Sequence, residues 1–137
     1  MITPDSSVTI AAAAPWHVAH EAAVAALAAG QPSLIAHVAF ETTAALSRMP
    51  DGQRLTPAVV LQWLDLRFGA RWIALPRVAA RRALRTAVEL GIRGGALYDA
   101  LIAATATHHH HALLSADRRA APVYSALGAN VVYIVNP

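Results

Sequence analysis

Short apolar runs alternate with longer stretches of helical character along the whole chain. The short runs lack the apolar–polar alternation of a half-exposed strand, whereas the longer stretches repeat apolar residues at helical spacing. Thr56 followed by Pro57 is typical of a helix start, and Gly69 is typical of a helix end. We expect strands at residues 1–4, 33–36, 71–75, 112–115 and 130–135, and helices at residues 17–29, 38–47, 57–68, 78–90, 97–109 and 119–127.

Buried strands that alternate with helices are typical of a parallel sheet covered by helices on both faces. We therefore expect an α/β fold with three layers. A length of 137 residues fits a single domain, residues 1–137, that can bury a sizeable core. Because 56% of the residues are hydrophobic and only 14% are charged, the composition excludes an intrinsically disordered chain.

High hydropathy in this chain comes from alanine rather than from a membrane span. The longest stretch without charge, residues 22–40, is interrupted by Gly30 and Pro32, so it is not a continuous apolar span of ~20 residues. No basic segment of a signal peptide precedes the first strand. The absence of cysteine excludes thiolate metal sites and cysteine nucleophiles, and it suits a reducing cytoplasm. We expect a cytoplasmic protein with no membrane partner.

Four of the eight acidic residues interrupt or end apolar segments. Asp5 and Asp117 each follow an expected strand, while Glu41 and Asp99 share helical stripes with residues typical of a core. Ligands of open parallel sheets bind at the carboxyl ends of the strands, and helices start from that same edge. We therefore expect the four carboxylates to converge there.

Each of these acids also has an ordinary structural interpretation. Asp5 can form a turn or cap a helix, and Asp117 can cap the helix that follows it. Asp99 can favour the positive end of a helix dipole, and Glu41 can lie on a solvent-exposed face. Their shared position at one edge of one sheet favours a common role instead.

Four converging carboxylates repel one another unless a cation neutralises them. Oxygen ligands without cysteine or histidine favour a hard ion, Mg²⁺, for which Mn²⁺ can substitute. Water activated by such an ion can attack a phosphodiester in line. Ser7 and Ser115 stand beside Asp5 and Asp117, where their hydroxyls could orient the ligands or a water; helix capping is an equally open interpretation.

All eleven basic residues are arginine, and the net charge is +3. Arg118 and Arg119 directly follow Asp117, so they are candidates for holding a phosphate group. Arg77, Arg81 and Arg85 share one face of an expected helix. That face is either an ordinary solvated surface or a strip that follows a row of phosphates.

The run His108–His111 contains four consecutive histidines. Two of them would share one helical face, which is one requirement of a metal site. We expect instead a helix end with imidazoles that face the solvent.

The chain resembles the PIN-domain ribonucleases, and among them the VapC toxins of bacterial type II toxin–antitoxin pairs, over essentially its whole length. The resemblance rests on four segments: Asp5-Ser6-Ser7, Glu41 at the start of an apolar helix, Tyr98–Ala106 and Leu113–Asp117. It implies a PIN-like domain with Mg²⁺-dependent endoribonuclease activity. In this family the acids that match Asp5, Glu41, Asp99 and Asp117 bind the metal and support cleavage of the RNA substrate.

The resemblance also implies a homodimer and a cognate VapB-type antitoxin whose C-terminal segment blocks the site. Residues 59–68 are apolar around much of their helix, as a surface for a second copy or an antitoxin would be. The sequence departs from the family at Pro4, where an aliphatic residue is usual, and at Arg118 and Arg119, where some members carry a further acid.

Two other functions are compatible with these residues. A non-cleaving module on the same fold would bind RNA or an antitoxin without hydrolysis. A phosphatase-type α/β enzyme would share the topology, but Asp5-Ser6-Ser7 lacks the Asp-x-Asp pattern of the haloacid-dehalogenase type.

Overall fold

Five short parallel strands lie at the centre of the computed structural model, which describes residues 1–135. Three strands form one sheet in the order β1-β4-β5, and two strands form a second sheet, β2-β3. Ser33 connects the two sheets, because its N–H donates to Ile2 O at 3.0 Å and its carbonyl accepts from Thr3 Oγ1 at 2.8 Å. The strands are β1 (Ile2–Pro4), β2 (Leu34–Ile35), β3 (Trp72–Ile73), β4 (Ala112–Ser115) and β5 (Val131–Tyr133).

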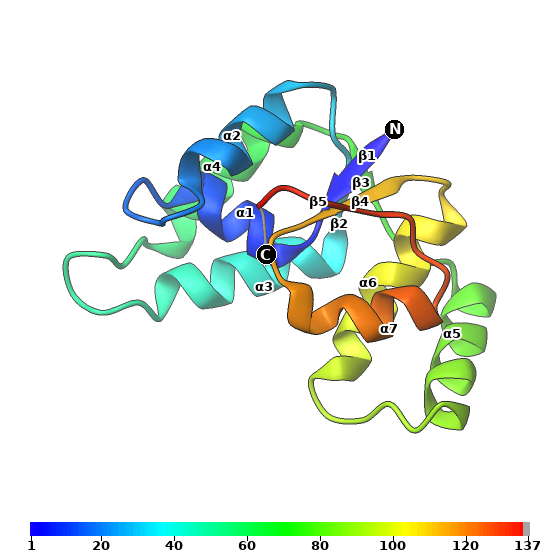
Figure 1. Cartoon of the computed structure of the whole chain (residues 1–137). Coiled ribbons are helices and arrows are strands. Elements are labelled where there is room, and N and C mark those ends of the chain that lie inside the picture. The colour runs from blue at the N-terminus through cyan, green and yellow to red at the C-terminus, as the bar shows by residue number, and fades with distance from the viewer. Residues whose placement is uncertain (136–137) are drawn as a thin grey trace.

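Seven α-helices pack in two groups on opposite sides of the strands (Figure 1). One group contains α1 (Ser6–Ala13), α2 (His20–Ala28), α3 (Ala36–Ser47) and α4 (Pro57–Phe68). The other contains α5 (Arg77–Glu89), α6 (Ala96–His108) and α7 (Ala121–Ala126), which follows the 3₁₀ turn η1 (Arg118–Ala120). This arrangement confirms the expected α/β fold with a parallel sheet between helices. Within residues 1–135, no helix is long and apolar enough to cross a membrane.

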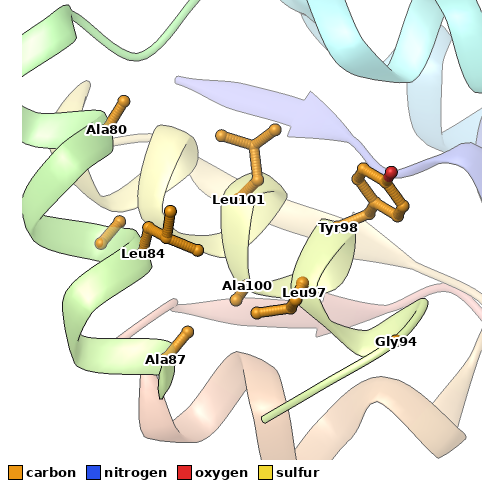
Figure 2. Close-up of a pocket in the computed structure, with 9 residues that line it drawn as sticks. Ala80, Leu84, Ala87, Gly94, Leu97, Tyr98, Ala100 and Leu101 are labelled. Atoms are coloured by element: carbon orange, nitrogen blue, oxygen red, sulfur yellow. The ribbon is translucent and has the colours of Figure 1, made fainter. Parts of the chain in front are cut away.

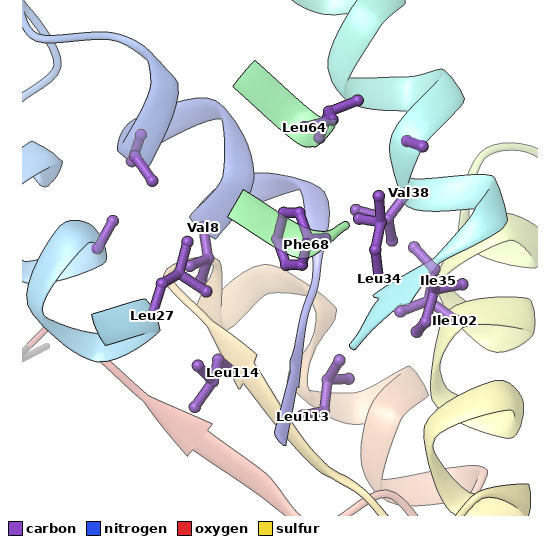
Figure 3. Packing of buried hydrophobic residues seen from close by; sticks show 14 of the residues in the cluster. Val8, Leu27, Leu34, Ile35, Val38, Leu64, Phe68, Ile102, Leu113 and Leu114 are labelled. Carbon is purple, nitrogen blue, oxygen red and sulfur yellow. The ribbon is translucent and has the colours of Figure 1, made fainter. Parts of the chain in front are cut away.

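Apolar side chains from both sheets and from the surrounding helices form one core (Figure 3). Val8, Leu27, Leu34, Ile102 and Leu113 are each at most 1% exposed. Burying one such side chain contributes about 1.5–3 kcal/mol. Because helices cover both faces of β1, β2 and β4, most side chains on both faces of these strands are buried, and this explains why the strands lack polar alternation.

Several predicted elements lie at their expected positions. Strand β4 has the predicted bounds. In α4, Thr56 Oγ1 accepts from Val59 N at 3.3 Å, and Gly69 ends the helix with a φ of 56° that other residues rarely adopt. These local signals were sufficient because they depend only on neighbouring residues.

Helix α1 was not expected from the sequence. Its segment contains the β-branched residues Val8, Thr9 and Ile10, which lower helix propensity. The helix forms because the side chain of Asp5 caps it by accepting from Val8 N and because one of its faces is buried in the core. Tertiary packing therefore outweighs the local preference here.

Histidines at the end of α6 differ from the prediction in one respect. His108 and His110 are exposed, as expected. His111 is only 8% exposed, and its Nε2 lies 3.2 Å from Ser33 Oγ. The expectation of a solvent-facing imidazole is wrong for His111, because the positive φ of His110 turns the chain back toward the sheet.

Candidate metal centre

Asp5 follows β1 and is held by the groups around it. Its N–H donates to Leu114 O at 2.9 Å, and its side chain is buried. Oδ1 accepts from Ser7 Oγ at 2.5 Å and from Val8 N at 3.3 Å, while Oδ2 accepts from the Tyr124 hydroxyl at 2.8 Å. Burial raises the pKa of Asp5, and the hydrogen bonds from neighbouring hydroxyls and from Val8 oppose that shift.

Ser7 and Ser115 lie where the ends of β1 and β4 meet. Ser7 Oγ donates to Asp5 and also accepts from Ala116 N at 2.8 Å, so it joins the start of α1 to the end of β4. Ser115 Oγ accepts from Asp117 N at 3.0 Å, and Ser115 also helps to lower the pKa of Asp5. Both serines therefore contact the acids that they adjoin in the sequence.

Asp117 lies after β4 and is more open than Asp5. Its Oδ1 accepts from Arg119 N at 3.0 Å and lies 3.2 Å from Arg119 Nε. The Arg119 side chain is 93% exposed. Arg118 points elsewhere, with its guanidinium 4.2 Å from the centre of the Tyr133 ring. Of the two arginines, Arg119 lies closer to the carboxylates.

Glu41 enters the cluster from α3. Its Oε2 lies 3.7 Å from His37 Nε2, and its Oε1 is buried with no hydrogen-bond partner among residues 1–135. Burial raises the pKa of Glu41, the neighbouring His37 and Ser6 side chains oppose the shift, and the charge of Asp5 adds to it. This carboxylate is therefore close to Asp5 and has a free acceptor.

Asp99 lies in the first turn of α6. Burial, followed by the negative charges of Glu41, Asp117 and Asp5 in that order, raises the pKa of Asp99 to about 6. Charges raise the pKa of a carboxylate in this way when they lie near it. The structure therefore brings the four predicted acids together at the carboxyl ends of β1 and β4.

The chemistry of this donor set fits a hard divalent cation. Burial raises the pKa of Asp5, Glu41 and Asp99, and Glu41 Oε1 is buried without a hydrogen-bond partner among residues 1–135. A divalent cation would stabilise such groups in their charged form. As the side chains lie, no three histidine, aspartate or glutamate residues in the described part of the chain surround a common point. Asp5 and Asp117 use their oxygens for internal hydrogen bonds instead.

Two residues that lie beside the acids, His37 and Tyr124, were not predicted from the sequence. His37 could have been noticed because it precedes Glu41 by one helical turn, a spacing that places two side chains on one face. Tyr124 gave no local signal, because 119 residues separate it from Asp5.

An apolar groove runs between α5 and α6 (Figure 2). Its volume is about 480 Å³, and it contains no acidic residue. Tyr98, which directly precedes Asp99, lies at one end of the groove. The other lining residues are small or aliphatic: Ala80, Ala83, Leu84, Ala87, Gly94, Leu97, Ala100 and Leu101.

Residues 2–125 match the family model of the PIN domain. The chain therefore belongs to the PIN-domain family. It is 40% identical over 131 residues to Ribonuclease VapC40 of Mycobacterium tuberculosis strain H37Rv, covering 96% of this chain and 97% of the relative. It is 36% identical over 128 residues to Ribonuclease VapC27 of the same strain, covering 93% of both chains.

Solved structures show the same fold. FitAcB from Neisseria gonorrhoeae has a TM-score of 0.70 and 20% identity, covering 96% of each chain. FitAB bound to the IR36 DNA fragment has a TM-score of 0.72 and 21% identity, covering 98% of this chain and 95% of that one. At this level of identity the similarity concerns the fold alone.

Proposed function

We propose that this chain is a Mg²⁺-dependent endoribonuclease, with Mn²⁺ as a substitute, that acts as the toxin of a type II toxin–antitoxin pair. The main observation is the cluster of Asp5, Glu41, Asp99 and Asp117, in which the pKa of Asp99 rises to about 6. Relatives named ribonucleases, similar over nearly the whole chain, support the same conclusion.

In this proposal the four carboxylates hold the cation and differ in how firmly they are placed. Asp5 is fixed by Ser7 and Tyr124, whereas Glu41 offers the unpartnered Oε1. When bound, Mg²⁺ neutralises the cluster, lowers the pKa of a water and stabilises charge on a phosphate. Ser115 keeps the backbone of Asp117 in place through the hydrogen bond to Asp117 N.

The RNA phosphate would be held by arginine. Arg119 has an exposed guanidinium next to Asp117, and such a group can donate two hydrogen bonds to one phosphate. Arg118, stacked on Tyr133, is a second contact further along the strand ends. Hydrolysis by attack of water in line would leave a 5′-phosphate and a 3′-hydroxyl.

Protein partners are also part of the proposal. Leu66 is 89% exposed and Leu61 is 51% exposed on α4, and the groove between α5 and α6 is apolar. Such surfaces fit contact with a second copy in a homodimer and with a VapB-type antitoxin. The lack of cysteine fits action on RNA in the cytoplasm.

Cleavage can be tested with purified protein and total RNA, with Mg²⁺ or with a chelator. We expect Mg²⁺-dependent fragments from the wild type and none from Asp99→Asn. Asp65→Asn is a matched control, because Asp65 is exposed on α4. Asp99→Asn should bind RNA as well as the wild type or more tightly, since a negative charge near the phosphates is removed.

The outcome also separates cleavage from binding alone. Identical RNA profiles with and without Mg²⁺, together with tight RNA binding, would contradict the nuclease and support a non-cleaving module. In a bacterial host, induced wild type should arrest growth and Asp99→Asn should not. Growth arrest by both proteins would show that the toxicity does not arise from the carboxylates.

A further inference from the structure

His37 lies on α3, one turn before Glu41, and contacts both helices that carry acids of the cluster. We propose that His37 is a positioning residue, whose Nε2–H holds the carboxylate of Glu41 in the orientation that the metal requires. This inference rests on the proposed function, because it assigns a role in the same site. The sequence had indicated only carboxylates and hydroxyls in this site, so the role of His37 is an addition to it.

Burial of the two facing polar groups is the first argument. His37 Nε2 lies 3.7 Å from Glu41 Oε2, and the two side chains are 27% and 31% exposed. His37 Nε2 and Glu41 Oε1 are both buried without a hydrogen-bond partner in residues 1–135. A buried polar atom without a hydrogen-bond partner lowers the stability of the fold by about 1–3 kcal/mol. Two such atoms side by side therefore call for an explanation, and a role in a functional site is one. A small rotation of either side chain would bring Nε2 and Oε2 to hydrogen-bond distance.

The backbone of α3 is held in place next to Glu41, whereas the Glu41 side chain needs a separate restraint. Thr42 Oγ1 lies 2.6 Å from Thr9 Oγ1, and it also donates to Val38 O at 2.7 Å. This buried contact fixes the backbone next to Glu41 against α1. Ser6 and His37 are the polar side chains next to the Glu41 carboxylate that can restrain its torsions, and of these two His37 also contacts α6.

The imidazole ring of His37 adds a link to the second acid-bearing helix. It stacks on the ring of Tyr98, with centroids 4.9 Å apart and planes inclined by 11°. Tyr98 directly precedes Asp99 in the first turn of α6. His37 therefore contacts Glu41 through one ring atom and the start of α6 through its ring face, which fixes the two carboxylates relative to each other.

Two substitutions separate these contacts. His37→Phe keeps an aromatic ring on Tyr98 but removes Nε2, whereas His37→Gln keeps a donor near the position of Nε2 but removes the ring. His108→Phe is the matched control, because His108 is exposed and lies nine residues beyond Asp99, about 13 Å along the helix. Mn²⁺ affinity is measured by electron paramagnetic resonance without RNA, and kcat and KM are measured separately with RNA.

We expect His37→Phe to weaken Mn²⁺ binding about 10–100-fold, as is typical when a group that orients a metal ligand is lost. Its kcat should fall while the KM for RNA stays within about threefold, since His37 Nε2 is buried and faces Glu41 rather than the solvent. His37→Gln should recover most of the Mn²⁺ affinity, and His108→Phe should match the wild type.

Three results would overturn the proposal. Wild-type Mn²⁺ affinity in His37→Phe would show that Nε2 does not position Glu41. Equal losses in His37→Phe and His37→Gln would show that the donor is not the relevant group. Hyperfine coupling of bound Mn²⁺ to the His37 nitrogen would make His37 a ligand rather than a positioning residue. If the wild type cuts no RNA, the proposed function fails, whereas the Mn²⁺ titration still decides the role of His37.

Discussion

Asp5 and Asp117 occupy equivalent places at the ends of the neighbouring parallel strands β1 and β4. Each caps the helical turn that follows, Asp5 through Val8 N and Asp117 through Arg119 N. They differ in their surroundings, because Asp5 is 2% exposed whereas the side chain of Asp117 is 35% exposed. Asp5 accepts hydrogen bonds from three groups of the interior, while Asp117 contacts a surface arginine.

In the proposed function, each of these two carboxylates would both cap a helical turn and hold the metal. The position after a parallel strand supplies both a free helix N–H and proximity to the other strand ends. Burial then determines how rigid the carboxylate is. The buried side chain of Asp5 is held in one orientation, whereas the partly exposed side chain of Asp117 has room to change its rotamer.

The largest effect on RNA cleavage should come from replacing Asp5, the carboxylate held by three hydrogen bonds. Asp5→Asn should lower RNA cleavage on the order of 10³-fold, because a carboxylate with a single orientation is lost next to the metal. Asp117→Asn should lower it about tenfold, since the open side retains an oxygen ligand and can rearrange. Single-turnover cleavage assays at saturating Mg²⁺ would measure both. Equal losses would contradict the distinction between a fixed and an adjustable acid.

A smaller effect is expected when only the support of Asp5 is removed. Tyr124→Phe deletes the hydroxyl that donates to Asp5 Oδ2 and should lower the free energy of unfolding by about 1–3 kcal/mol. Mg²⁺ affinity should fall about tenfold. Chemical denaturation and calorimetric titration would measure the two changes. Tyr133→Phe is the control for stability, because it keeps the ring under Arg118.

Stability in the absence of divalent ions should depend on the charge of Asp99. The folded protein raises the pKa of Asp99 from 3.8 to about 6, so the folded state binds a proton more readily than the unfolded chain. Stability therefore falls as pH rises between these values. Asp99→Asn should melt about 2–4 °C above the wild type at pH 7 with a chelator, and the gap should close near pH 3.

Melting curves recorded across this pH range would test the sign of the effect. Added Mg²⁺ should stabilise the wild type more than Asp99→Asn and narrow the gap at pH 7. A variant less stable than the wild type at pH 7 in chelator would show that the partly buried charge of Asp99 does not destabilise the fold.

The smallest effect is expected when the exposed arginine beside Asp117 is replaced. Arg119→Ala removes an exposed partner of Asp117, and the melting temperature should change by less than about 1 °C, because surface ion pairs contribute little. RNA binding should weaken by less than about tenfold, with a smaller dependence on salt concentration. A binding titration at several salt concentrations would measure this. A large loss of stability would place Arg119 among the structural residues.

Local patterns in the sequence predicted most of the elements and the shared location of the acids. Strand β4 and the start of α4 depend on neighbouring residues, so they could be predicted. Helix α1 could not, because its burial against the sheet outweighs the β-branched residues within it. The roles assigned to the four acids and to the serines stay predictions until the variants are measured.

Contacts between distant residues limited the prediction of the site. The hydroxyl of Tyr124 reaches Asp5 across 119 residues, and His111 reaches Ser33 across 78 residues. Neither contact follows a helical or strand period, so no spacing in the sequence indicates it. The stack of His37 on Tyr98 likewise depends on how α3 and α6 pack.

The pairing of β1 with β4 places two segments that are far apart in the sequence side by side, since Pro4 lies opposite Leu114. During synthesis on a ribosome, Asp5 emerges long before its neighbour Asp117 and its hydrogen-bond donor Tyr124. A nascent or truncated chain that stops before residue 117 lacks one of the four carboxylates. An unfinished copy of this protein therefore lacks the complete carboxylate cluster.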